Sequence, residues 1–452
     1  MPPLNTNPIF NMQVSFKNIW NITFPVLLSI MVEQFISMTD TAFLGRLGEV
    51  ELGASALAAT YYFIFYVIGS GFGVGAQILM ARMNGEKSYH QINSIFLTSG
   101  IFLVGLAAFI ILLSKIFSPI ILKWFISADD IYSATISYLD WRIYGLFFSF
   151  TMVIFRSLFI AVTHTRILTV SSIIMVLVNI ICNYTLIFGK FGFPHLGIAG
   201  AAIGSTVAEL VATLFLYVYI RRKASYKKYN LFSSIHFQWG LLKRIMKMSF
   251  WTMIQALLSL STWFVFFIMI EHLGKTSLAV GNIIRNISAI PFIFTMAFAT
   301  TVNSLISNLI GAGYQHQVLK LCKKVIVMCF LFIVPIILLA CVFPRFFLSI
   351  YTDNQTLINT AIPTLYVMLF AHLIAAPAFI MNFAVSGTGN SKAASLLELG
   401  TLAIYVLYIS FVTGYLKQNI TISWTAEYFY GIFLFAGSIL YMWKGKWRNK
   451  QI

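Results

Sequence analysis

The chain has 452 residues, of which 59% are hydrophobic and 10% are charged, and its mean hydropathy is +0.87. Soluble domains carry about 25% charged residues, so this composition excludes an ordinary soluble protein and predicts an all-α, polytopic membrane protein. The formal net charge of +17 does not indicate a nucleic-acid partner, because the basic residues gather in particular connections. The apolar runs are continuous rather than alternating, which excludes a β-barrel.

Twelve apolar segments follow one another, each long enough to cross a hydrocarbon core about 30 Å thick. They lie at about 19–43, 53–80, 94–118, 132–162, 167–189, 197–220, 248–272, 278–310, 323–348, 357–386, 393–415 and 425–443. The stretch 1–13 is polar and lacks the basic region and apolar core of a cleavable signal, so we expect the first segment to remain as a membrane span.

The first span carries two acids, Glu33 and Asp40, inside its apolar run. They lie two helical turns apart on one face, and Ser29 and Ser37 precede them on the same face. A charge inside a bilayer costs at least about 2.5–3.5 kcal/mol, so it usually faces the bundle interior and has a function. We expect Asp40 to carry the coupling ion of a transporter; the alternative is a structural hydrogen bond.

Polar residues on the second and fifth spans are further candidates. Gln77 lies deep in the second span, where it could face a cavity. Asn179 and Asn183 lie one helical turn apart in the fifth span and face the same way. Amides can hold a carboxyl group in either protonation state or help to bind a cation, so they suit Asp40 as partners. The alternative is that they only hold helices together, which is common in membranes.

The basic residues indicate how the chain is oriented. Those between the sixth and seventh spans, without an intervening acid, are Arg221, Arg222, Lys223, Lys227, Lys228, Lys243, Arg244 and Lys247. The connections after the second and eighth spans and the C-terminal tail are also basic. With twelve spans and both termini in the cytoplasm, all of these segments lie on the cytoplasmic side, as the positive-inside rule requires.

The two halves of the chain repeat with a shift of 226 residues, from Gly85 to Gly311 for example. The same shift matches Gln77 with Asn303, so both are candidates for a substrate cavity. Because each half holds six spans, the sequence predicts two parallel six-helix lobes related by a pseudo-two-fold axis along the membrane normal. The predicted parts are an N-terminal lobe over 1–220, a basic cytoplasmic connection over 221–247 and a C-terminal lobe over 248–452.

Other signals argue against enzymatic chemistry. Glu209 and Glu398 also lie inside apolar runs, but neither is accompanied by a clustered nucleophile and base. The four cysteines have no CxxC or CxxH spacing, and no HExxH, GxSxG or Walker A motif occurs. We therefore expect no enzyme, no cofactor and no metal beyond a possible Na⁺ at Asp40.

Several stretches together resemble the MATE (multidrug and toxic compound extrusion) family. They are Thr39–Gly48 followed by Leu57-Ala58-Ala59, then Gly197–Ala202 at the start of the sixth span, and Gly387–Lys392 after the tenth. The resemblance covers nearly the whole chain. It implies an antiporter that exports amphipathic, often cationic organic compounds in exchange for H⁺ or Na⁺.

The resemblance also implies an ion site in the N-terminal lobe. Asp40 matches its acid on the first span, Asn179 and Asn183 match its polar residues on the fifth span, and Ser205 is the nearest match for a small residue on the sixth. Asn183 fits the NorM-like branch, whereas another branch has Asp there. Glu33 remains a secondary ion-coupling candidate.

Two positions complete the comparison with the family pattern. Gln34 lies where an amide is the commoner family choice, and we assign it to the substrate cavity. NorM-like members have a Glu in the middle of the seventh span, but Met253–Leu260 contains no acid. Coupling through the N-terminal lobe is therefore favoured over a cation site in the C-terminal lobe.

Two other functions compete with this interpretation. A related lipid-linked oligosaccharide flippase would need basic residues in its cavity, for which Arg156 and Arg285 are candidates. An intramembrane enzyme would need convergent catalytic groups. We expect a monomeric secondary transporter of small organic substrates in the lipid bilayer of a bacterial inner membrane.

Overall fold

A computed structural model describes residues 15–232, 236–445 and 447–448. The polar stretch 1–13 and Lys446 and Lys450 of the basic tail lie outside these residues, as does part of the basic connection. Within the described residues the chain is helical and has no β-strand. The helices are α1 (Phe16–Gly45), α2 (Glu49–Gly85), α3 (Tyr89–Phe125), α4 (Asp129–Arg142), α5 (Gly145–Ala161), α6 (Arg166–Phe188), α7 (Gly197–Arg222), η1 (Ala224–Tyr229), α8 (Trp239–Glu271), α9 (Lys275–Gly311), η2 (Gln315–Gln317), α10 (Val318–Val342), α11 (Pro344–Ser349), α12 (Gln355–Gly387), α13 (Ser391–Ile409), η3 (Ser410–Tyr415), α14 (Ile420–Ser423) and α15 (Ala426–Lys444).

The all-α membrane fold is confirmed. Within the described chain, ten helices are long and apolar enough to cross a membrane, and α4 with α5 can form an eleventh span bent by 50°. Helix α15, with 19 residues, occupies the place of the twelfth predicted segment. The predicted span over 132–162 is broken between α4 and α5, and Arg142, the last residue of α4, lies at the break.

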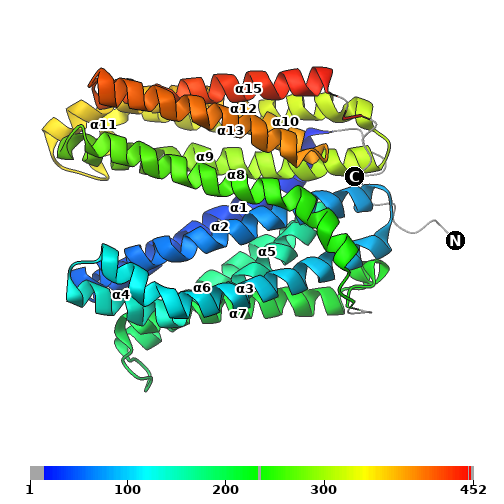
Figure 1. Cartoon of the computed structure of the whole chain (residues 1–452), viewed down its shortest axis with the longest axis horizontal. Coiled ribbons are helices and arrows are strands. Elements are labelled where there is room, and N and C mark those ends of the chain that lie inside the picture. Colours follow the sequence, from blue (N-terminus) through cyan, green and yellow to red (C-terminus); the bar gives the residue numbers. More distant parts are fainter. Residues whose placement is uncertain (1–14, 233–235, 446, 449–452) are drawn as a thin grey trace. The chain divides into compact units, whose positions relative to one another are not determined.

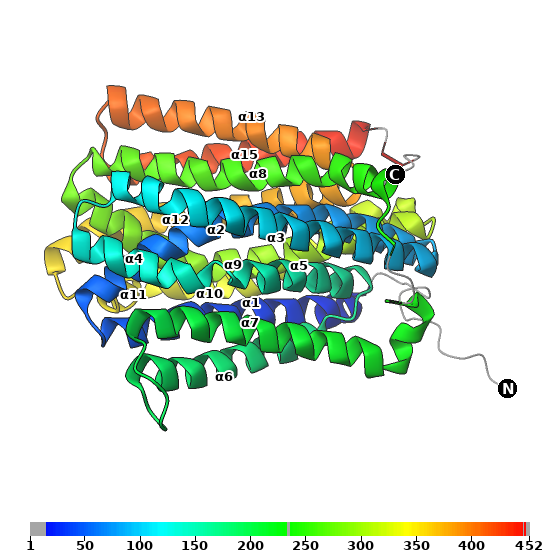
Figure 2. The same ribbon diagram turned by 60° about the horizontal axis from the view of Figure 1, so that its bottom comes forward.

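The chain forms two compact units. The N-terminal unit runs from Leu28 to Met253, and the C-terminal unit combines the residues up to Leu27 with those from Ile254 onward. Helices α1 and α8 therefore each contribute to both units, and the unit boundaries differ from those expected from the repeat. Figures 1 and 2 show each helix in the sequence colours.

The N-terminal unit places glycines of α2 against the first part of α8. Thr252 donates a hydrogen bond of 2.6 Å to the carbonyl oxygen of Gly71, and Ser249 donates one of 3.0 Å to that of Phe72. A Cβ atom at Gly71 would lie 2.7 Å from the Cα of Met253. The glycines of α2 thus permit close packing of helix backbones, which is why residues 239–253 of α8 belong to this unit.

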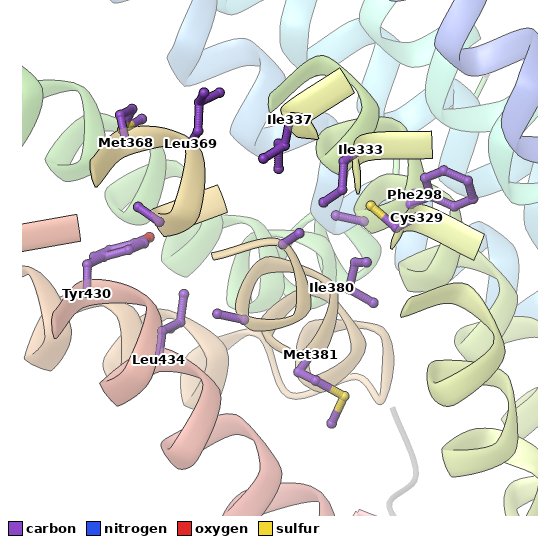
Figure 3. Packing of buried hydrophobic residues seen from close by; sticks show 14 of the residues in the cluster. Phe298, Cys329, Ile333, Ile337, Met368, Leu369, Ile380, Met381, Tyr430 and Leu434 are labelled. Atoms are coloured by element: carbon purple, nitrogen blue, oxygen red, sulfur yellow. The ribbon is translucent and has the colours of Figure 1, made fainter. Parts of the chain in front are cut away.

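The C-terminal unit has an apolar core, part of which Figure 3 shows. Phe298, Cys329 and Ile333 pack between α9 and α10, while Tyr430 and Leu434 of α15 face α12. At the start of α1, Trp20 stacks on Phe332 with ring centroids 4.5 Å apart. This stacking explains why the first residues of α1 belong to the C-terminal unit.

The basic connection begins with the short helix η1, which packs on the N-terminal unit through aromatic rings. His164 Nδ1 lies 3.0 Å from the Tyr226 hydroxyl, and the Tyr229 hydroxyl donates to Asn84 Oδ1 at 3.3 Å. Burial, and secondarily the Lys228 charge, lowers the pKa of His164 below its usual value of 6.5. Docking of η1 therefore favours the neutral imidazole.

Candidate functional site

The N-terminal unit contains an open cavity of about 930 Å³, lined by residues of α1, α2, α4, α5, α6 and α7. Most of its wall is apolar or aromatic, with Tyr62, Phe63, Tyr66, Met152 and Met175 among its residues. The buried or half-buried charged groups in the wall are Glu33, Asp40, Arg142, Arg156 and Glu209. A cavity of this size fits a small organic molecule.

Asp40 of α1 is held by neutral donors from α6 and α7. Asn183 Nδ2 donates to Asp40 Oδ1 at 2.5 Å, and Ser205 Oγ donates to Asp40 Oδ2 at 3.1 Å. Asn179 completes the cluster, because its Nδ2 donates to Ser205 Oγ at 3.1 Å and its Oδ1 accepts from Asn183 at 3.2 Å. Four of the five residues expected to couple the ion, all but Glu33, are therefore in one hydrogen-bonded group.

Small residues of α7 make this cluster possible. Gly200 lies so close to α6 that a Cβ atom would be 2.7 Å from the Leu186 carbonyl oxygen. A Cβ atom at Gly204 would lie 2.6 Å from Asn183 Oδ1. Because α6 and α7 lie side by side at this short distance (Figure 2), the hydroxyl of Ser205 reaches Asn179.

The other two buried or half-buried acids of the cavity wall have cationic partners. Arg142 binds Glu209 through two hydrogen bonds of 3.0 and 2.6 Å, and its guanidinium lies 3.9 Å from the centroid of the Tyr62 ring. A Cβ atom at Gly145 would occupy the space of this pair, so glycine is needed at the start of α5. Sequence reasoning placed Glu209 inside a span but did not find its partner, which lies 67 residues away.

Glu33 forms a separate site on the same face of α1. Its Oε1 accepts from Arg156 Nη2 at 2.5 Å, from Ser172 at 3.1 Å and from Ser29 at 3.2 Å. The expectation that Glu33 and Asp40 share one polar helix face agrees with their positions in the cavity wall. Their environments differ, because Glu33 forms an ion pair whereas Asp40 accepts its hydrogen bonds from neutral groups.

The charges of the cavity therefore do not balance. Arg142 neutralises Glu209, and Arg156 neutralises Glu33. Among the ion pairs of the described residues, none includes Asp40. Asp40 thus differs from Glu33 and Glu209, which are each paired with an arginine.

The three amides expected in a substrate cavity lie elsewhere. Gln34 is exposed on α1 and Gln77 is buried in α2, and neither lines the cavity described above. Asn303 is buried in α9 of the C-terminal unit, where its Nδ2 donates to the Phe383 carbonyl oxygen at 3.1 Å. The structure does not bring these three residues together with Asp40 around the cavity.

The C-terminal unit contains a buried acid to which the sequence assigned no role. Glu398 of α13 is 3% exposed and accepts hydrogen bonds from Gln255, Ser259 and Asn382. The middle of α8 lacks an acid, as noted from the sequence, but its amide Gln255 binds one supplied by α13. The repeat shift pairs Glu398 with Ser172, and this pairing was the signal that could have found the site.

Comparison with known proteins places this architecture in a family. The MatE family model matches residues 25–185 and 252–416, which together make up most of the chain. The chain belongs to the MATE family. This MATE-family protein is a secondary transporter rather than an enzyme, as the sequence predicted.

Relatives of similar length support the assignment. A probable multidrug resistance protein NorM from Thermotoga maritima is 23% identical over 96% of this chain and 94% of its own, and one from Synechocystis is 25% identical over 96% and 95%. A solved MOP superfamily transporter from Pyrococcus furiosus has a TM-score of 0.87 at 15% identity and covers 98% of both chains. The eukaryotic MATE transporter AtDTX14 has a TM-score of 0.83 at 16% identity over 96% of both. At these identities the solved structures show the fold that this MATE protein shares with them.

Proposed function

We propose that this MATE-family transporter exports amphipathic, cationic organic compounds in exchange for H⁺ or Na⁺. The observation that carries the proposal is the carboxyl group of Asp40, which lines a large cavity and forms no ion pair among the described residues. Asn179, Asn183 and Ser205 complete the proposed ion site. The drug-resistance names of the relatives from Thermotoga maritima and Synechocystis support the substrate class.

The cluster can hold Asp40 in both of its charge states. The ionised carboxylate accepts from the Asn183 amide and the Ser205 hydroxyl. When a cation binds, carboxamide oxygens become useful, because a proton on Asp40 needs an acceptor and Na⁺ needs oxygen ligands. Asn183 Oδ1 is buried and has no hydrogen-bond partner within the described chain, so it can supply that oxygen.

Alternating access follows from competition for this charge. A bound cation neutralises Asp40, which removes the attraction between the cavity and a cationic substrate and lets α1 repack. The substrate then leaves on one side of the membrane and the ion on the other. The wall of aromatic and Met side chains suits varied apolar cations, since such surfaces adapt in shape and attract positive charge.

The flippase alternative is disfavoured by the same charge pattern. A lipid-linked diphosphate needs uncompensated basic groups, but Arg142 and Arg156 are both bound to glutamates. Arg285, in the C-terminal unit, stacks over the ring of Phe267 at 4.9 Å. A drug exporter, unlike a flippase, needs no uncompensated positive charge in its cavity.

We further propose that the protein works as a monomer in a bacterial inner membrane with both termini in the cytoplasm. The basic residues around η1 support this orientation through the positive-inside rule. Thiol labelling of cysteines introduced singly at the two ends of α7 in intact cells tests it. Labelling of the η1 end from outside the cell would contradict the assignment.

Transport by purified protein in proteoliposomes tests the coupling. A pH gradient and a Na⁺ gradient are imposed separately, and ethidium movement is followed by fluorescence. Asp40→Asn should insert normally but lose gradient-driven transport. Asp140→Asn is the matched control, because Asp140 is an exposed aspartate paired with Lys115. Transport by Asp40→Asn at the parental rate would refute the proposed ion site.

A further inference from the structure

The two halves of the chain build a carboxylate site at the same four repeat positions. The shift of 226 residues that joins Gly85 to Gly311 was found from other residues. Applied to the glutamate site of the N-terminal unit, it pairs Ser29 with Gln255, Glu33 with Ser259, Arg156 with Asn382, and Ser172 with Glu398. All eight residues take part in hydrogen bonds around a glutamate.

The glutamate lies on helices that do not correspond to each other in the two halves of the repeat. In the N-terminal unit it is Glu33 of α1, and a serine of α6 donates to it. In the C-terminal unit it is Glu398 of α13, whose Oε1 accepts from Ser259 of α8 at 2.6 Å. Its Oε2 accepts from the Gln255 amide and from Asn382 Nδ2, the latter at 2.9 Å. In each unit the glutamate thus lies among the same four repeat positions, although it comes from a different helix.

Among the described residues, the glutamate of the C-terminal unit lacks the arginine counter-ion that Glu33 has. Arg156 forms an ion pair with Glu33, but the corresponding residue beside Glu398 is the neutral Asn382. No ion pair of the described residues includes Glu398, which is 3% exposed. A buried carboxylate that has only neutral donors is neutralised most simply by taking up a proton.

The titratable groups on the packed helices do not supply a compensating charge. On α15, Tyr430 forms a side-chain hydrogen bond to Glu398, and Glu427 is bound by the Tyr405 hydroxyl at 3.0 Å. On α12, His372 interacts with the backbone of Ser288. Lys392 and Lys444 lie at the ends of α13 and α15, and Glu271 ends α8.

The residues that surround Glu398 also offer an acceptor for a proton on its carboxyl group. The Gln255 Oε1 atom is engaged, because it accepts from Ser395 at 2.9 Å. Asn382 is fully buried, and its Oδ1 has no hydrogen-bond partner within the described chain. Rotation of this amide exchanges a donor for an acceptor, so Asn382 can bind either the carboxylate or the carboxylic acid.

We propose that Glu398 is a second proton-binding site of this transporter, located in the C-terminal unit. The Asn382 amide donates to the carboxylate and, after rotation, accepts from the carboxylic acid. The proposal rests on the proposed ion-coupled export. Water on one side of the membrane supplies the proton that converts the carboxylate to the acid, and the reverse step releases it on the other side. A proton fits better than Na⁺ because four donors, on Gln255, Ser259, Asn382 and Tyr430, already occupy the carboxylate oxygens.

Carbodiimide labelling of the unmodified full-length protein provides the first test. Dicyclohexylcarbodiimide reacts with protonated carboxyl groups in apolar surroundings and leaves a stable N-acylurea, which peptide mass spectrometry locates. Glu398 should be labelled at low pH and protected at high pH, while the ion-paired Glu33 and Glu209 stay unlabelled. Absence of label on Glu398, or label independent of pH, would overturn the proposal.

Proton counting with variants provides the second test. Proteoliposomes with a pH-sensitive dye report the protons moved per ethidium ion. Glu398→Gln should lower this number by about one relative to the parent and to the Asp140→Asn control. An unchanged number in a Glu398→Gln protein that melts like the parent would overturn the proposal. If Asp40→Asn keeps its coupling while Glu398→Gln loses it, the proposed Asp40 site fails and the Glu398 site stands.

Discussion

Replacing Glu209 with Gln should destabilise the N-terminal unit, because it leaves the Arg142 charge without its partner. The two side chains are 13% and 14% exposed, and their pair contains two hydrogen bonds. Removing one partner of a buried pair costs about 3–5 kcal/mol. The Gln side chain can still accept one hydrogen bond, and the adjoining cavity can admit water. We therefore expect the lower end, about 3 kcal/mol, or more than 100-fold in the unfolding equilibrium.

Thermal unfolding of purified protein in detergent, followed by far-UV circular dichroism, measures this effect. A loss of about 3 kcal/mol in a unit of this size lowers the melting temperature by about 6–12 °C. Asp129→Asn is the control, because it removes an ion pair with Lys123 whose side chains are 53% and 86% exposed, and it should not shift the melt.

A double variant separates the lost pair from other effects of the substitution. Combining Arg142→Gln with Glu209→Gln removes both charges, so the melting temperature should recover part of the loss. If Glu209→Gln melts like Asp129→Asn, the pair is not buried in solution. If the double variant is no more stable than Glu209→Gln, the unpaired charge is not the cause of the loss.

Three further predictions concern packing, pH and the proposed ion site. Gly71→Val should cost about 1–3 kcal/mol by overpacking α2 against α8, whereas Gly105→Ala, at a position with no atom near a new Cβ, should be neutral or stabilising in the same melt. Because folding lowers the pKa of His164, its contact with η1 stabilises the fold above pH of about 6.5 and weakens as pH falls toward the folded pKa. The rate at which trypsin cuts the basic connection, divided by the rate for His164→Gln at the same pH, should therefore be higher at pH 5.5 than at pH 7.5; an equal ratio at both pH values would refute it. Ser205→Ala removes one of the hydrogen bonds to Asp40, worth about 0.5–1.5 kcal/mol, and should shift the pH profile of ethidium transport without abolishing it, while an unchanged profile would place Ser205 outside the site.

Composition and local periodicity were enough to predict the helices and one pair of contacting faces. A long apolar run must become a helix in a bilayer, because only internal hydrogen bonds satisfy its backbone there. Glu33 and Asp40 lie two turns apart in the first span, and Asn179 and Asn183 lie one turn apart in the fifth. Each pair therefore gives its helix a polar face, and polar faces avoid lipid. The contact between Asp40 and Asn183 agrees with these constraints. Its role in ion coupling remains a prediction.

Only the tertiary structure decided which charges cancel. Glu33 and Arg156 are 123 residues apart, and Gln255 and Glu398 are 143 apart, so no helical period relates them. Their pairing depends on which helices pack together and where α4 bends into α5. The sequence thus determined that acids would lie inside the bundle. The packing of the helices determined that Asp40 and Glu398 accept hydrogen bonds from neutral groups while Glu33 and Glu209 are paired with arginines. Helix rotation and the choice of neighbours follow from contacts made along whole helices.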